Sequence, residues 1–407
     1  MMRPPPFRAE HIGSLMRPGE LLRARERHAA GKLDREALRE IENEAIARVV
    51  KLQEDVGLQV VTDGEFRRGT YSDAFTSAGI SGVKIEMTEG RGWTSSQTHG
   101  HRMARRIPTV VSRIDWKGPQ NADDFRFLKS LTTRTPKITL PGPCYIHYRA
   151  GRANLSRDVY PDLEAFWSDL VEAYIQEMRS LADAGCRYLQ IDETSLVKLG
   201  DPRVRQLLTE RGDDWRDLLR IYVDVVNAVV AGGPQGMTIG IHVCRSQDPS
   251  WQADVGYDPI AEPLFNAMKV DSYFLEYDNA RAGTFAPLRN VPEGKIRGAR
   301  PRRLQGFRTG ERRYAQTADR GGKPLCQARA IGLEPAVRVC DQRRRARHGH
   351  GGGRTDEARP HRRGGAAGLG QRDVVAPAIF VTTDPRAARS PAGKPNPKTS
   401  TRAGSPA

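Results

Sequence analysis

The chain of 407 residues carries a formal net charge of +16, and the whole excess lies in its last 112 residues. Residues 1–295 hold 40 Lys and Arg against 41 Asp and Glu, whereas residues 296–407 hold 25 against 8, a net charge of +17. A pI near 9.9 is typical of nucleic-acid-binding proteins, but this balance excludes that inference for the first 295 residues, which are close to neutral.

The first predicted strand lies near Ile12, and the first clear helix follows it. Apolar residues from 38 to 52 recur every three or four positions, which indicates one buried helix face, and Gly57 stops the helix. Residues 58–61 are then predicted as a buried strand that ends at the polar run 62–65. We interpret residues 90–120 as an inserted excursion over the sheet.

The same unit recurs along the chain. A further strand is predicted near Ile138, and residues 163–181 are predicted as a helix, with Asp162 as its N-cap and Gly185 as its stop. The later segments, in chain order, are a strand at 188–191 leading into Asp192 and Glu193, a helical stretch at 203–231, a strand at 238–244 and a strand at 273–276.

Helices that alternate with short apolar strands predict a parallel sheet of the α/β class. Polar residues follow each strand, and both open α/β sheets and (β/α)₈ barrels place their chemistry at the carboxyl ends of the strands. The sequence contains no G-x-G-x-x-G and no P-loop, which disfavours nucleotide binding. We expect a (β/α)₈ TIM-type barrel of which six strands are recognisable.

The number of cysteines and the length of the apolar runs indicate the cellular compartment of the protein. Five cysteines, at 144, 186, 244, 326 and 340, are few and scattered, which favours a reducing cytoplasm over a disulfide scaffold. The first ten residues lack the apolar region of a secretory signal, and no run approaches 18 apolar residues. We therefore expect a cytoplasmic protein without a membrane span.

His242 and Cys244 point to the same face of one predicted strand, because they are two residues apart. Imidazole and thiolate are zinc ligands, and Glu276 at the end of the next strand can add a carboxylate. Each signal is weak alone, since a buried core histidine and a solvated loop acid are the commoner cases. Acids at two further strand ends, which can bind an amino group or shift one another's pKa, are Asp63, Glu65, Asp192 and Glu193.

Together these segments resemble the cobalamin-independent methionine synthase family, in its catalytic C-terminal barrel and its single-barrel relatives. The motifs that carry the resemblance occur in the family's order over about residues 10–295: His11-Ile12-Gly13-Ser14-Leu15-Met16-Arg17-Pro18, Thr62-Asp63-Gly64-Glu65-Phe66, Gly142-Pro143, Gln190-Ile191-Asp192-Glu193, His242-Val243-Cys244 and Leu275-Glu276. The resemblance implies zinc held by His242, Cys244, Glu276 and one further Cys. It also implies that the amino acid portion of homocysteine is bound by Ile12, Ser14, Glu65 and Asp192.

The implied reaction moves a methyl group to homocysteine and yields methionine. Two-barrel members of the family use methyltetrahydrofolate polyglutamate, and the methyl donor of this chain stays open. Thiol chemistry is consistent with a zinc site in such a reaction. A thiol with a pKa near 8.5 is mostly protonated at pH 7, and it loses its proton when it binds zinc.

The family's second zinc cysteine lies late in the chain, in a strand close to S-P-x-C-G-F, and this sequence has no such run. Shifting the reading frame by one nucleotide can turn residues 332–340 into L-S-P-Q-C-G-F-A and residues 298–305 into V-L-G-L-V-A-S. We infer an out-of-frame end that begins near residues 295–300. It would remove two strands and the family's proton donor, so no catalytic residue is assigned and activity is expected to be impaired.

The resulting division is an incomplete barrel at 1–295 and a disordered Arg/Gly/Pro-rich tail at 296–407 that binds nucleic acid only non-specifically. Two alternatives remain open. One is a zinc-dependent thiol alkyltransferase of the epoxide–coenzyme M type, although a sulfonate acceptor would favour basic residues where Glu65 and Asp192 stand. The other is a non-enzymatic chain whose tail binds polyanions.

Overall fold

The computed structural model describes residues 7–88, 105–245, 253, 255–277, 282–292, 296–300 and 378–381. The α-helices of these segments are α1 (Gly19–Ala29), α2 (Arg35–Asp55), α3 (Ala122–Ser130), α4 (Tyr145–Ala150), α5 (Leu163–Asp183), α6 (Pro202–Arg211) and α7 (Trp215–Ala231). The strands are β1 (Phe7–Glu10), β2 (Val60–Val61), β3 (Val83–Thr88), β4 (Arg105–Val110), β5 (Thr135–Pro136), β6 (Ile138–Pro141), β7 (Tyr188–Asp192), β8 (Thr238–Val243), β9 (Ser272–Glu276), β10 (Ile296–Arg300) and β11 (Ala378–Val381).

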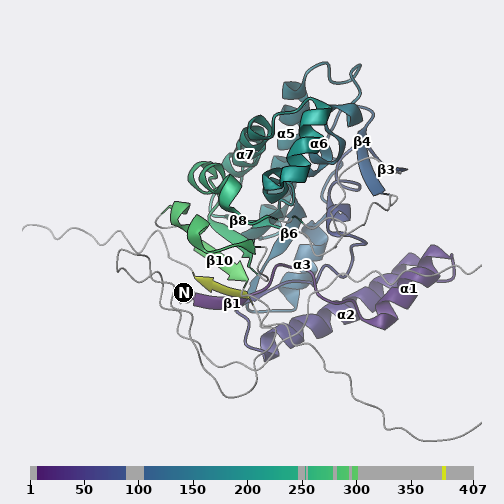
Figure 1. Cartoon of the computed structure of the whole chain (residues 1–407). Coiled ribbons are helices and arrows are strands. Elements are labelled where there is room, and N and C mark those ends of the chain that lie inside the picture. Colours follow the sequence, from purple (N-terminus) through teal and green to yellow (C-terminus); the bar gives the residue numbers. More distant parts are fainter. Residues whose placement is uncertain are drawn as a thin grey trace, which may run out of the picture.

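The main sheet has seven strands in the order β1-β11-β10-β9-β8-β7-β6. Neighbours from β6 to β10 are parallel, and β11 runs antiparallel between β10 and β1 (Figure 1). Because α-helices lie between β6 and β7 and between β7 and β8, and these strands are parallel, the predicted α/β class with a parallel sheet is confirmed. β2 pairs separately with β5, the short strand directly before β6.

The predicted barrel is not confirmed by this pattern. Within the described segments no strand pairing joins β1 to β2, which closure of the ring would require. Single hydrogen bonds do connect the two regions: Leu15 N donates to Gly64 O over 3.1 Å, and Thr62 Oγ1 donates to Gly13 O over 2.7 Å. The chain after β1 therefore lies beside the end of β2.

The helix predictions hold where a cap and an apolar face coincide. α2 and α5 contain the predicted stretches 38–52 and 163–181, and Asp162 caps α5 by accepting from Ala165 N over 3.0 Å. The single helical stretch expected at 203–231 is wrong. Gly212, at a φ of 86°, ends α6, and Asp214 begins α7 by accepting from Arg216 N and Asp217 N.

The predicted excursion at 90–120 is described from residue 105 on, and its strand β4 forms an antiparallel ribbon with β3, which precedes the excursion. β3 pairs with β4 along six residues each, and residues 89–104 between them lie outside the described segments. The chain after the ribbon is anchored to α5, because Trp116 Nε1 donates to the buried Glu177 Oε2 over 2.8 Å. The ribbon thus belongs to the α5 side of the molecule.

Beyond residue 295 we expected no strand, and this expectation is wrong at β10 and β11. The physical reason is that a strand edge presents unpaired N–H and C=O groups, which can pair with backbone of almost any composition. The other residues of the predicted tail, 301–377 and 382–407, lie outside the described segments, so its disorder stays a prediction.

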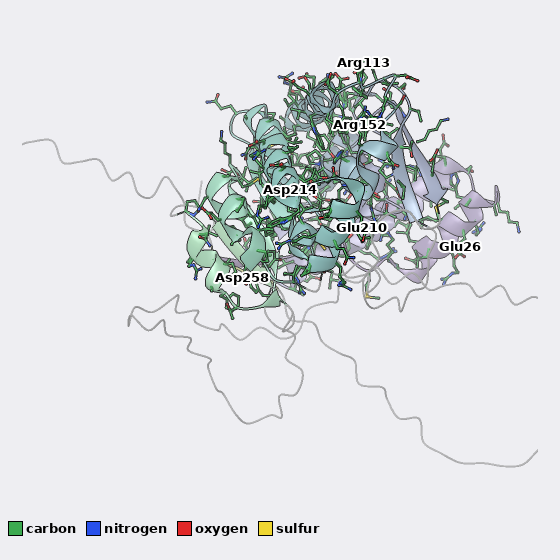
Figure 2. All side chains as sticks on the ribbon, turned by 45° about the horizontal axis from the view of Figure 1, so that its top comes forward. Glu26, Arg113, Arg152, Glu210, Asp214 and Asp258 are labelled. Atoms are coloured by element: carbon green, nitrogen blue, oxygen red, sulfur yellow. The ribbon has the colours of Figure 1, made fainter. Side chains whose placement is uncertain are left out.

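Apolar side chains fill the space between the sheet and its helices. One cluster joins α7 to β8 and β9, and another joins α5 to β6 and β7. Charged side chains such as Glu26, Asp214 and Asp258 lie on the outside (Figure 2). No helix in the described segments is long and apolar enough to cross a membrane.

Candidate active site

Strand register brings the predicted site residues to one end of the sheet. β6, β7, β8 and β9 are parallel, so their carboxyl ends lie together. Asp192, the last residue of β7, is opposite His242 of β8, and Val243 is opposite Leu275 of β9, one residue before Glu276. The polar residues that follow separate strands in the sequence are therefore neighbours in space.

His242, Cys244 and Glu276 form a three-residue donor cluster. One ligand atom from each lies within 4.8 Å of the others, and His242 and Glu276 are buried. Cys244 Sγ and Glu276 Oε1 are 3.7 Å apart, and Glu276 Oε2 accepts from Arg245 N over 2.8 Å. His242 and Cys244 lie close together as the i, i+2 pattern predicted, although Cys244 is one residue beyond the end of β8.

The donor set fits a zinc ion. Imidazole, thiolate and carboxylate are the ligand types that zinc takes in proteins. His242 Nδ1 lies 3.0 Å from Phe274 O, and a carbonyl can only accept, so the ring proton is on Nδ1 and the Nε2 lone pair is the one suited to a metal. The described segments thus offer three candidate ligands.

No second cysteine joins this cluster as a fourth ligand in the described segments. Cys144 Sγ donates to Tyr222 O over 3.7 Å, and Cys186 Sγ donates to Tyr188 O over 3.4 Å. Cys326 and Cys340 lie outside the described segments. The further cysteine that the family resemblance implied is therefore not identified.

Tyr257 holds the strands of the donor cluster together, and the sequence analysis did not predict this role. Its hydroxyl accepts from Glu276 N over 2.7 Å and donates to Val243 O over 3.0 Å, so one buried side chain ties the end of β9 to the end of β8. Nothing in the local sequence marks this tyrosine, because its partners are backbone groups of distant strands.

Glu65 occupies a second, polar subsite at the same end of the sheet. Its carboxylate accepts from Ser14 Oγ over 2.5 Å and from Thr139 Oγ1 over 2.8 Å, and Arg68 Nη1 lies 3.6 Å away. Burial opposes ionisation, but Arg68 and these hydrogen bonds outweigh it and lower the pKa of Glu65. Glu65 is thus held as a carboxylate.

The backbone at Glu65 is strained. It has a φ of 59°, the only positive value among the non-glycine residues described. A left-handed conformation costs a residue with a Cβ roughly 1–3 kcal/mol and persists where the surroundings enforce it, often at functional sites. Arg17 Nη2 donates to Glu65 O over 2.9 Å and helps to hold this geometry.

Gly13 allows the chain after β1 to approach Glu65 closely. A Cβ at this position would lie 2.7 Å from Thr139 Cγ2 and 3.0 Å from Glu65 Oε1. On either side of it, Ile12 directs its carbonyl to Gln190 Nε2 over 2.6 Å, and Ser14 bonds Glu65. A larger residue at 13 would push this segment away from the site.

Asp192 differs sharply from Glu65 in its charge state. Burial, followed by the negative charge of Glu65, raises the pKa of Asp192 to about 8. Gln190 Nε2 donates to Asp192 Oδ1 over 2.6 Å and partly offsets this effect. Two buried carboxyl groups that share one end of a sheet and differ in charge are suited to receive a cation.

The other two acids at the strand ends have backbone partners. Asp63 Oδ1 accepts from Glu65 N over 2.9 Å, which shapes the turn after β2. Glu193 accepts from Cys144 N over 3.1 Å and from Ser195 N over 3.1 Å. Burial raises the pKa of both groups. Their hydrogen bonds to backbone N–H groups support loop geometry, whereas the negative charge of Glu65 is the largest charge effect on Asp192.

Comparison with known proteins shows which proteins this chain resembles. The profile of the cobalamin-independent synthase catalytic domain matches residues 7–291. The Bacillus subtilis protein YxjH, which is uncharacterized, is 37% identical over 71% of this chain and 75% of its own length. A methionine synthase of Saccharolobus solfataricus is 32% identical over 64% of this chain and 66% of its own length. A solved Listeria monocytogenes structure, provisionally described as a vitamin-B12-independent methionine synthase, has a TM-score of 0.55 at 32% identity and covers 72% of this chain and 78% of that one.

Proposed function

Because this chain belongs to the cobalamin-independent synthase family by its catalytic domain, we propose that it is a cytoplasmic, zinc-dependent methyltransferase that acts on homocysteine and yields methionine. The observation that carries the proposal is the donor cluster of His242, Cys244 and Glu276, whose ligand atoms lie within 4.8 Å of one another. The methyl group would come from 5-methyltetrahydrofolate or another methyl donor. The family itself is one of methionine-forming enzymes.

In this proposal the donor cluster holds zinc. Zinc supplies the means to deprotonate the homocysteine thiol at neutral pH, since a metal-bound thiol is a thiolate. His242 is held by Phe274 O, and Glu276 by Arg245 N and Tyr257, so the protein orients these ligands before the metal arrives.

The second subsite would hold the amino acid end of homocysteine. Glu65 and Asp192 would receive the ammonium group, with the Ile12 carbonyl and Ser14 beside them. The cation would favour the charged form of Asp192, whose pKa is raised in the empty site. Since β7 and β8 are adjacent and Asp192 is opposite His242, an amino acid anchored there directs its side chain towards the donor cluster.

The chain differs from the family pattern in its last part. We propose that residues 7–291 form an incomplete version of the family's eight-stranded barrel, and that the late zinc cysteine and the final strands are absent because the end of the chain is read out of frame. Three protein ligands bind zinc more weakly than four, so activity should be impaired. The epoxide–coenzyme M alternative is less well supported, because a sulfonate would meet the buried acids Glu65 and Asp192.

The first experiment measures zinc in purified protein. We expect the unaltered chain to contain less than one zinc per molecule, readily removed by a chelator, and Cys244→Ser to contain none. Cys186→Ser is the matched control, because this buried thiol bonds Tyr188 O and not the donor cluster. Full zinc occupancy that survives Cys244→Ser would refute the ligand assignment.

The second experiment assays methyl transfer directly. Homocysteine is incubated with the protein and 5-methyltetrahydrofolate, as monoglutamate and as polyglutamate, and methionine is quantified. A methionine yield that requires zinc and His242 supports the proposal. Equal turnover of a thiol sulfonate would instead support the alkyltransferase alternative.

A further inference from the structure

A buried lysine lies beneath the candidate site. Lys137, immediately before β6, is fully buried, and its Nζ lies 2.7 Å from Glu10 Oε1. The same Nζ donates to His11 O over 2.7 Å and to Gln190 Oε1 over 2.8 Å, and it lies 4.6 Å from the centre of the Phe274 ring. This ammonium therefore ties the segment after β1 to β7 and β9.

Lys137 determines which way the Gln190 amide points. An ammonium group only donates, so the Gln190 atom that faces Lys137 must be the oxygen. The NH₂ end must then face the other way, where it donates to Ile12 O and to Asp192 Oδ1, both over 2.6 Å. An NH₂ group has two protons, and each has one acceptor here.

The two acceptors of Gln190 are both groups that the proposed function assigns to the substrate ammonium. Gln190 Nε2 donates to Asp192 Oδ1, so Oδ2 is the oxygen available to a ligand. When Asp192 is protonated, the proton is therefore on Oδ2. The Ile12 carbonyl is held at the same time and by the same side chain. One amide thus sets the position of two oxygens assigned to ligand binding, one at the end of β7 and one in the segment after β1.

We propose that Gln190, oriented by Lys137, is a positioning residue that presents Asp192 and the Ile12 carbonyl to the ammonium group of the amino acid substrate. This role rests on the proposed function and adds to it the part of the molecule that determines selectivity for an amino acid. A purely structural glutamine would support the fold equally for ligands with and without an ammonium group. Selectivity therefore distinguishes the two roles.

The test uses Gln190→Glu in the full chain. This isosteric change keeps an oxygen for Lys137 but replaces the NH₂ group with a second oxygen facing Ile12 O and Asp192. Asp192 must then move away or stay protonated, and either response weakens its attraction for a cation. Calorimetry compares L-methionine with 4-(methylthio)butanoate, which lacks only the ammonium group.

We expect the unaltered chain to prefer methionine, and Gln190→Glu to weaken methionine binding about 10- to 100-fold. The binding of 4-(methylthio)butanoate should change by less than about threefold. Asn227→Asp is the matched control. It also converts a largely buried amide to an acid and removes a donor, but this amide is on α7 and donates to Ala267 O, not to a group of the candidate site. That control should leave both affinities unchanged.

Other outcomes overturn the role in distinguishable ways. Equal weakening of both ligands by Gln190→Glu would show a structural role only, and unchanged methionine binding would remove Gln190 from the site. If the unaltered chain binds no methionine, the proposed function fails and this role fails with it. Should Gln190→Glu not fold, Gln190→Met removes both donors without adding charge and must lower the methionine preference in the same way.

The part played by Lys137 is tested separately. Lys137→Met combined with Glu10→Gln removes the buried ion pair without leaving a lone charge. The Gln190 amide then loses the group that orients it, so the preference for methionine should fall, by less than in Gln190→Glu. An unchanged preference would show that Gln190 keeps its orientation without Lys137.

Discussion

Binding of an amino acid should expel a proton from Asp192. Burial and the neighbouring charge of Glu65 raise the pKa of this carboxyl to about 8, so it is mostly protonated at neutral pH. An ammonium group in contact with it favours the carboxylate and lowers its pKa. Between these two pKa values binding releases a proton, and affinity rises with pH.

The size of the effect follows from the pKa. At pH 7 a group with a pKa of about 8 carries about 0.9 of a proton, so binding should release nearly that much. By linkage, the affinity for methionine should increase about eightfold between pH 6.5 and pH 7.5, and level off above pH 8.

The assay is calorimetry at pH 7 in two buffers with different ionisation enthalpies, which yields the number of protons released. Asp192→Asn keeps the shape of the side chain and cannot ionise, so it should release none, bind methionine more weakly and show little pH dependence. 4-(Methylthio)butanoate should release none from the unaltered chain. Proton uptake, or equal release by Asp192→Asn, would refute the assigned role of Asp192.

The same carboxyl predicts a pH dependence of folding stability. Because its pKa in the folded state lies above the usual value of 3.8, the folded chain binds the proton more tightly than the unfolded chain. The resulting stabilisation is complete below the unfolded pKa and is lost as the pH rises towards 8. As the pH rises over this range, the unfolding free energy of the unaltered chain should therefore fall relative to that of Asp192→Asn.

Three further predictions concern the donor cluster and the end of the chain. Tyr257→Phe leaves Glu276 N without its acceptor, which should cost about 1–3 kcal/mol of unfolding free energy and lower zinc affinity, whereas Tyr273→Phe, whose hydroxyl contacts are 3.3–3.4 Å long, should not affect zinc. Equal zinc loss in both variants would contradict this. Limited trypsin digestion should leave a core that ends soon after β10, and a protected fragment extending past Arg345 would show a folded tail. Deleting or inserting one nucleotide near codon 296 should restore the late cysteine, one bound zinc and homocysteine methylation; equal activity of the two forms would disprove the out-of-frame hypothesis.

Much of the fold was predictable because its signals are local. The apolar period and the capping aspartate of α5 act within a few residues, and so do the short apolar strands before Asp192 and Glu276. The break at Gly212 was missed, because the apolar period continues on both sides of it. The strands β10 and β11 were missed because their pairing depends on available backbone edges and not on side-chain pattern.

The sequence by itself identified the chemistry of the site: a histidine and a cysteine on one strand, a glutamate on the next, and acids at two other strand ends. Only the tertiary structure decided the partners of each acid. Glu65 accepts from the side chains of Ser14 and Thr139, whereas Glu193 accepts from backbone N–H groups. It also decided that Lys137 orients Gln190. These contacts join residues about 50 to 180 positions apart, and no sequence period extends over such separations.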